Sequence, residues 1–184
     1  MLRRTAITAI ATLACTTVSA KSWLETIEDL NDYSSEAGTL KLVSSSPLKF
    51  EIFQTDAAKQ QPAYKAEAVN RAAIYGIYRT FIHTDVPELE VAAGLLEMHS
   101  AVPRVVKPNP QYKVVVRTTR EQALKAISSL LPEVKSFQDL VAKQTVGGLV
   151  FDDLWTDAFD SVYLKGSEQA KLLKALNAKT SYGK

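Results

Sequence analysis

The sequence predicts an α+β fold in which one antiparallel, four-stranded sheet packs against a long central helix. Short stretches that alternate apolar and polar residues indicate strands. Longer stretches with an apolar residue every three or four positions indicate helices. These elements follow one another in the order α-ββ-α-ββ-α and end in a helical C-terminal tail, an arrangement typical of α+β domains rather than α/β domains.

The first half of the chain contains a short helix and two strands. A capping box at residues 22–25 predicts a helix over 22–33, with apolar residues at helical spacing. Apolar and polar residues then alternate over 40–42 and again over 48–52. The serine- and proline-containing segment 44–47 separates them, so we expect two antiparallel strands joined by a turn.

The central helix is predicted over residues 63–83, and two further strands are predicted over 88–98 and 111–117. The second of these strands contains three consecutive valines, which favour extended structure. The connection between them, 99–110, contains three prolines. Because proline fixes φ and lacks an N–H donor, we expect a stiff, extended loop there.

The last third of the chain is predicted to be helical. A second capping box favours a helix over 118–131, which Pro132 ends. The remaining predicted elements are a short helix over 136–143, a break at Gly147–Gly148, an amphipathic helix over 151–162 and a final helix over 167–178. We therefore expect one domain over residues 21–184, with 21–131 as its sheet–helix core and 132–184 as a helical tail packed on it.

The first twenty residues have the pattern of a bacterial export signal. Arg3 and Arg4 precede a short apolar stretch, and small residues precede a cleavage point after Ala20. The apolar stretch is well below the ~20 residues that a permanent membrane helix needs. We expect a periplasmic protein without a membrane span in its mature chain. A minor alternative is a lipoprotein acylated at Cys15.

The composition narrows the classes of partner. Cleavage after Ala20 would remove the only cysteine, two of the 22 basic residues and none of the 20 acidic residues. The mature chain would then be neutral and thiol-free, which argues against nucleic acid as the main partner. We expect no cofactor, and the sequence does not define an oligomeric state.

A stripe along the central helix is the first candidate ligand site. Tyr64, Glu67, Arg71, Tyr75 and Tyr78 fall on one broad face, where Arg71 could hold a carboxylate or phosphate. The structural alternative is a Glu67–Arg71 ion pair beside core tyrosines. In either case we expect the aromatic side of the helix on the sheet and its small residues against another helix.

A second candidate surface is the proline-containing loop, where Arg104, Val105, Val106 and Lys107 could dock on a protein partner. Proline lowers the entropy that such a segment loses on docking. The structural alternative is a connection without a binding role.

Two groups of metal-ligand residue types have simpler explanations. A strand of about ten residues separates His83 from His99 by roughly 30 Å, so they cannot share a metal ion. Four aspartates occur between residues 152 and 160, and we expect them on the solvated face of the predicted helix 151–162. We therefore predict no metal site.

Together these features predict an exported, non-catalytic protein that binds an envelope protein. The alternative is a small anionic-ligand binder that uses the tyrosine and arginine stripe. A hydrolase is less well supported, because it would require His83 or His99 to meet a carboxylate and a hydroxyl in space.

Overall fold

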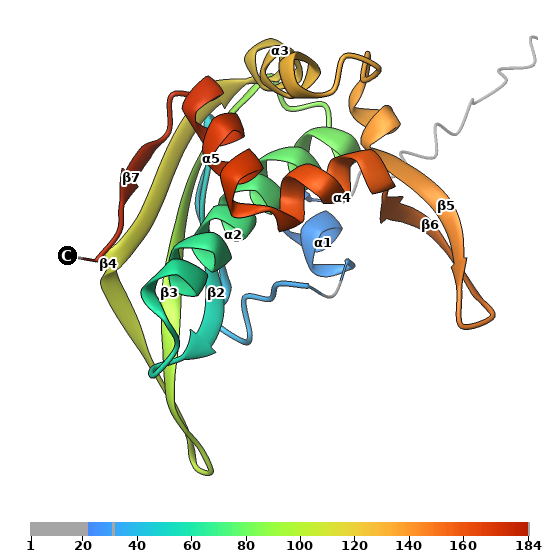
Figure 1. Ribbon diagram of the computed structural model, residues 1–184. Helices are drawn as coiled ribbons and strands as arrows, with labels where there is room; N and C mark the ends of the chain where they lie inside the picture. The colour runs from blue at the N-terminus through green and yellow to red at the C-terminus, as the bar shows by residue number, and fades with distance from the viewer. Residues whose placement is uncertain (1–21, 31, 184) are drawn as a thin grey trace, which may run out of the picture.

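The computed structural model describes residues 22–30 and 32–183, and it confirms an α+β fold (Figure 1). Helices cover one face of a five-stranded sheet, and a separate two-stranded hairpin projects from the body. The predicted export signal, its cleavage point and Cys15 lie outside the described residues. No helix within the described ranges is long and apolar enough to span a bilayer.

The main sheet is mixed rather than antiparallel, and it has one strand more than predicted. Its strands, in spatial order, are β1 (Leu40–Ser45), β2 (Leu48–Ala57), β3 (Glu88–Ala101), β4 (Arg104–Thr119) and β7 (Lys179–Ser181). The β2–β3 pair is parallel, with Leu48 beside Leu89, and the other pairs are antiparallel.

Helix α2 (Pro62–His83) is the reason that the antiparallel prediction is wrong for β2 and β3. Its 22 residues extend about 33 Å, and the ten residues of β2 extend about the same distance. The helix therefore returns the chain to the end of the sheet where β2 began. A strand that starts there and pairs with β2 must be parallel to it.

Helix α2 contacts the sheet through its small residues, which reverses the predicted orientation. A Cβ atom on Gly76 would lie 2.9 Å from the Phe50 ring and 3.2 Å from Val91. The tyrosine side faces away from the sheet, where Tyr75 lies near Tyr33 and Tyr78 lies near Phe159. Small residues on the sheet side allow the long helix to lie close to the large apolar side chains of β2 and β3.

Residues 99–110 form the far end of the β3–β4 hairpin rather than the predicted loop. Pairing between β3 and β4 continues to Ala101 and Arg104, and the hairpin extends from the body of the molecule (Figure 1). Pro108 and Pro110 are tolerated because β4 pairs with β7 only at residues 113–115, so no second neighbour requires their missing N–H groups.

The C-terminal third contains a second hairpin that the sequence analysis did not predict. Strands β5 (Val141–Val146) and β6 (Leu149–Trp155) are antiparallel. They are joined by Gly147 (φ 59°) and Gly148 (φ 83°), and positive φ at both positions is typical of a tight hairpin turn. The predicted helix 151–162 is therefore wrong in its first half.

The remaining helices are shorter than predicted, and α4 begins six residues later than the predicted helix 151–162. They are α1 (Trp23–Glu28), α3 (Arg120–Leu130), a 3₁₀ helix (Phe137–Leu140), α4 (Asp157–Leu164) and α5 (Gly166–Ala175). Thr156 caps α4 by accepting a hydrogen bond from Phe159 N at 3.3 Å. Helix α5 packs on the outer side of α2 and leads into β7 at the edge of the sheet (Figure 1). The predicted tail is thus mixed rather than wholly helical.

Candidate ligand-binding cleft

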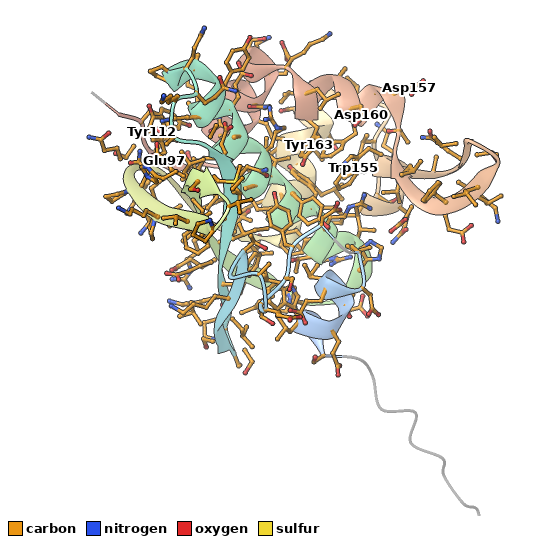
Figure 2. The ribbon with its side chains drawn as sticks, turned by 90° about the horizontal axis from the view of Figure 1, so that it is seen from below. Glu97, Tyr112, Trp155, Asp157, Asp160 and Tyr163 are labelled. Carbon is orange, nitrogen blue, oxygen red and sulfur yellow. The ribbon has the colours of Figure 1, made fainter. Side chains whose placement is uncertain are left out.

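A cleft of about 390 Å³ lies on the side of α2 that faces away from the sheet. It is lined by Asp32, Tyr33, Gln54, Tyr75, Arg79, Leu154, Trp155 and Tyr163. These residues come from the segment after α1 and from β2, α2, β6 and α4. Trp155 and Tyr163 lie near the middle of the view in Figure 2, well separated from Glu97 and Tyr112 on its left side. The volume falls within the range of small-molecule sites.

Four aromatic side chains form the walls of the cleft. The ring centroids of Tyr33 and Tyr75 are 4.8 Å apart, and those of Tyr75 and Trp155 are 6.4 Å apart with the rings nearly perpendicular. Tyr163 continues the wall at 5.8 Å from Trp155. The Tyr33 hydroxyl donates to Gln54 Oε1 at 3.0 Å. These contacts fix the rings, so the cleft is formed before any ligand arrives.

Arg79 is the buried cation of the cleft, with 6 % of its surface exposed. Its guanidinium carbon lies 3.7 Å from the centroid of the Trp155 ring, a close cation–π contact. Nη1 donates to the Asp153 carbonyl oxygen at 2.7 Å and lies 3.6 Å from Asp153 Oδ2. Cation–π stacking and the Asp153 contacts therefore hold one edge of the guanidinium in place.

One buried polar atom of the cleft, Nε of Arg79, lacks a hydrogen-bond partner among the described residues. The Tyr75 hydroxyl lies beside Asp32 and donates a hydrogen bond to its carboxylate. A buried polar group without a partner costs roughly 1–3 kcal/mol. Native proteins retain few such groups, and each calls for an explanation. A ligand that accepts hydrogen bonds would satisfy Arg79 Nε.

The tyrosine hydroxyls of the cleft stay protonated at neutral pH. Burial raises the pKa of Tyr33 and Tyr75 well above the usual value, and the negative charge of Asp32 raises both pKa values further. Burial also raises the pKa of Tyr163 to about 12. These hydroxyls therefore act as hydrogen-bond donors rather than as bases, and the one on Tyr33 already donates to Gln54 Oε1.

His83 lies one helical turn beyond Arg79 and shares its acidic partner. Its Nε2 is 3.6 Å from Asp153 Oδ2. Burial lowers the pKa of His83, and the positive charge of Arg79 lowers it further, although Asp153 opposes both effects. The imidazole is therefore neutral at pH 7, and the Asp153 carboxylate pairs mainly with Arg79.

The structure does not gather the five residues of the predicted stripe into one site. Tyr75 lines the cleft, but Tyr64 is exposed elsewhere, and Tyr78 is a core residue whose hydroxyl donates to the Ala123 carbonyl at 3.1 Å. Glu67 packs over Gly166, where a Cβ atom would lie 2.5 Å from its Oε1. Arg71 is half-buried, and its positive charge partly offsets the rise that burial causes in the pKa of Tyr33 and Tyr163.

Neither predicted explanation of Glu67 and Arg71 holds as stated. Within the described ranges, no ion pair joins these two side chains. The aromatic side of α2 faces α4 and the segment after α1, so the five predicted residues do not together line a cleft between the helix and the sheet.

Four residues of the cleft were not among the predicted site residues, namely Tyr33, Arg79, Trp155 and Tyr163. Arg79 had a usable signal, because a residue four positions after Tyr75 lies on the same face of the helix. Trp155 was assigned to the predicted helix 151–162, which ended one residue before Tyr163, whereas in the structure β6 ends at Trp155 and α4 carries Tyr163. The contribution of both to one cleft depends on tertiary packing and had no local signal.

The predicted partner loop is strand β4 near the hairpin turn. Val105 and Lys107 are exposed, Val106 is partly buried and Arg104 pairs with Ala101 through the backbone. The most exposed apolar side chain of this hairpin is Val102 in the turn, at 90 %.

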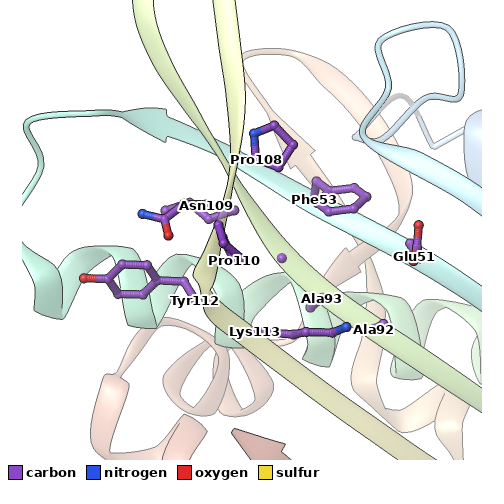
Figure 3. A pocket seen from close by; sticks show the side chains of 11 residues that line it. Glu51, Phe53, Ala92, Ala93, Pro108, Asn109, Pro110, Tyr112 and Lys113 are labelled. Atoms are coloured by element: carbon purple, nitrogen blue, oxygen red, sulfur yellow. The ribbon is translucent and has the colours of Figure 1, made fainter. Parts of the chain in front are cut away.

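A second hollow of about 180 Å³ lies beside this hairpin, on the face of the sheet opposite α2 (Figure 3). Phe53 and Pro108 lie at one end of it, and Tyr112 points away from them. Gly94 makes room for Phe53, since a Cβ atom there would lie 2.9 Å from its ring. This hollow is smaller than the Arg79 cleft.

Lys65 and Glu97 form a separate buried ion pair near the same hairpin. Their Nζ–Oε1 distance is 2.5 Å, and Asn109 donates to the same carboxylate oxygen at 2.8 Å. The hydrogen bonds from Lys65 and Asn109 lower the pKa of Glu97. Lys65 also donates to the Ala58 carbonyl at 2.8 Å. The arrangement is internally satisfied and ties α2 to the hairpin.

The histidines and aspartates do not converge on a metal centre in the described part of the chain. No group of three or more His, Cys, Asp or Glu residues there could hold a metal ion. His83 faces Asp153, whereas His99 lies 3.9 Å from Glu97. The predicted acidic helix face is wrong for Asp152 and Asp153, which belong to strand β6.

Comparisons with known proteins give no assignment. No family model, no curated protein and no solved structure matches the chain.

Proposed function

We propose that the protein is an exported binding protein whose ligand is a small molecule with an acidic group. The observation that carries the proposal is Arg79, a buried cation with an unpartnered Nε at the cleft. Carboxylates and phosphates accept two parallel hydrogen bonds from one edge of a guanidinium. Because Nη1 is already held by Asp153, the Nε edge is the one left for a ligand.

The tyrosines favour binding over catalysis in this cleft. Their raised pKa values keep the hydroxyls protonated, so they serve as donors and as flat apolar walls. The neighbouring His83 is neutral and turned toward Asp153. We therefore propose a non-catalytic role, as the sequence analysis expected, with the ligand site moved from the predicted stripe to the Arg79 cleft.

Intrinsic fluorescence offers a direct test. The chain has two tryptophans, Trp23 and Trp155, and only Trp155 lines the cleft. A Trp23→Phe variant of residues 21–184 would report on the cleft alone. We expect saturable changes in Trp155 emission with at least one of benzoate, phenylacetate and 3-phenylpropanoate.

Variants at two arginines separate a specific site from general charge. Arg79→Lys keeps a positive charge but loses the planar Nε edge, so we expect binding to weaken at least tenfold. Arg117→Lys is the matched control, because Arg117 is exposed on strand β4. Equal weakening by both variants, or no binding of any carboxylate to the parent, would contradict the proposal.

A protein partner is the second candidate function, and exposed apolar side chains of the β5–β6 hairpin favour it. Val146, Leu149, Val150 and Phe151 are 54, 66, 56 and 40 % exposed. Val146 pairs with Leu149, and Phe151 lies on the same face of β6 as Leu149, so three of the four share one side of the hairpin. Exposed apolar surface of this kind is typical of interaction sites. We propose this hairpin as the partner surface in preference to Arg104–Lys107, where the apolar side chains are fewer.

A comparison of two double variants tests this candidate. Leu149→Ser/Phe151→Ser alters the β5–β6 hairpin, and Val105→Ser/Val106→Ser alters the β3–β4 hairpin. We expect only the first pair to abolish capture of a specific envelope protein by the mature chain. If only Val105→Ser/Val106→Ser abolishes capture, the partner surface is the β3–β4 hairpin, as the sequence predicted.

Export remains part of the proposal and has its own test. The mature protein isolated from the periplasmic fraction should begin at Lys21, as measured by intact mass. An acylated chain that begins at Cys15 would instead support the lipoprotein alternative.

A further inference from the structure

Asp32 brings an acidic group to the same cleft as Arg79. It lines the cleft and is exposed at its rim. Within residues 22–30 and 32–183, it forms no ion pair. Its negative charge raises the pKa of Tyr33, Tyr75 and Tyr163, and its carboxylate accepts a hydrogen bond from the Tyr75 hydroxyl.

The cleft therefore offers two kinds of recognition. The guanidinium of Arg79 suits a carboxylate, whereas Asp32 beside the faces and hydroxyls of tyrosines suits an ammonium group. Aromatic rings attract cations through their electron-rich faces, and a nearby carboxylate adds direct attraction. A ligand with charges of both signs would satisfy both ends, and the aromatic wall between them would accommodate an apolar side chain.

The other charges around the cleft disfavour a strongly anionic ligand. Arg71 adds positive charge near the cleft. The carboxylate of Asp153 partly neutralises Arg79, and the charge of Arg79 also acts on the carboxyl group of Asp160. Among the described residues that line the cleft, Asp32 and Arg79 supply one charge of each sign. A phosphate dianion would bring two negative charges to one guanidinium beside a carboxylate, whereas a zwitterion would match both charges.

We infer that the ligand is a zwitterion of the amino-acid class, with its carboxylate on Arg79, its ammonium on Asp32 and an apolar side chain between Tyr75, Trp155 and Tyr163. This inference rests on the proposed function and narrows its ligand.

Three probes of one shape test the inference by fluorescence titration of the Trp23→Phe variant. L-phenylalanine carries both charged groups, 3-phenylpropanoate lacks the ammonium, and 2-phenylethylamine lacks the carboxylate. We expect L-phenylalanine to bind at least tenfold more tightly than either analogue. Asp32→Asn should remove its advantage over 3-phenylpropanoate without weakening the binding of 3-phenylpropanoate, because loss of a nearby negative charge does not disfavour an anion.

The outcomes separate the inference from the proposed function. If 3-phenylpropanoate binds as tightly as L-phenylalanine, the inference is overturned and a site for simple acids stands. If Asp32→Asn weakens both probes equally, Asp32 does not contact the ammonium and the inference is again overturned. If none of the three probes binds, the inference fails, and the benzoate and phenylacetate titrations decide the proposed function separately. Thermal unfolding of each variant would verify that it is folded.

Discussion

Replacing Gly76 by alanine should destabilise the protein, although alanine is the better helix former. In an exposed helix the change would stabilise by about 1 kcal/mol. Here the new Cβ atom would lie 2.9 Å from the Phe50 ring and 3.2 Å from Val91. Both neighbours are buried, and Trp23 packs on Phe50 with a centroid distance of 4.4 Å. The ring therefore cannot move aside freely.

The expected loss of stability is the cost of overpacking minus the gain in helix propensity. Overpacking of a buried contact costs roughly 1–3 kcal/mol. After the gain in helix propensity, we expect a net loss of about 1–2 kcal/mol in the free energy of unfolding. Urea denaturation measures it as a lower midpoint with an unchanged slope. Ala170→Gly, at an exposed position inside α5, is the control for propensity and should cost about 1 kcal/mol.

A second variant identifies the cause. In a Phe50→Leu background the ring is absent, so Gly76→Ala should lose most of its destabilising effect. This coupling is what a double-mutant cycle measures for residues in contact. If Gly76→Ala stabilises the parent, α2 does not lie this close to the sheet. The orientation of Tyr75 and Arg79 toward the cleft would then also be refuted, since the contact of Gly76 with the sheet determines it.

Three further changes test other parts of the structure. Because folding lowers the pKa of His83, the free energy of unfolding should fall as the pH drops below about 6.5. In His83→Gln the urea midpoint should therefore depend less on pH between pH 7 and 5 than it does in the parent. The same pH dependence in both proteins would contradict the burial of His83. Lys65→Met leaves the Glu97 carboxylate without its cation and should lower the free energy of unfolding by about 3 kcal/mol. Lys171→Met removes one partner of an exposed ion pair and should lower it by less than about 1 kcal/mol. Equal losses would argue against a buried Lys65–Glu97 pair. Gly148→Ala places a side chain at φ 83° and should lower the unfolding free energy by about 1–2 kcal/mol, and a neutral result would exclude the tight turn.

Local patterns predicted the elements of the first half well. The predicted capping box at residues 22–25 marks the start of α1, as the structure confirms. The box predicted at 118–121 lies one residue before the one that starts α3, which Thr119 and Gln122 form. The direction of β3 could not be obtained in this way. It depends on the comparison of two lengths, those of β2 and α2, and on which strand pairs with which.

The second half shows how a helical spacing can arise by coincidence. Phe151, Trp155 and Phe159 recur every four residues, but Trp155 ends a strand and Phe159 belongs to α4. The adjacent glycines at 147 and 148 carried the stronger signal. Two glycines between valine-containing stretches are typical of a hairpin turn. A hairpin turn places the residues after it in a strand rather than in a helix.

The candidate cleft could be predicted only in part. Tyr75 was among the predicted site residues, and Arg79 was accessible by extending the same helix face by one turn. Asp32, Trp155 and Tyr163 come from segments far apart in the sequence. Their convergence results from α4 packing on the side of α2 that faces away from the sheet, a contact that the assumed orientation of α2 excluded.

The central claim is that the Nε edge of Arg79 holds the acidic group of a ligand. The most direct test is the ¹⁵Nε–¹Hε resonance of Arg79, observed by NMR during titration with 3-phenylpropanoate. A new hydrogen bond should move the proton resonance downfield in a saturable manner and slow its exchange with water. If Trp155 fluorescence shows saturable binding while the Arg79 resonance stays unchanged, the ligand binds without this arginine and the account is wrong.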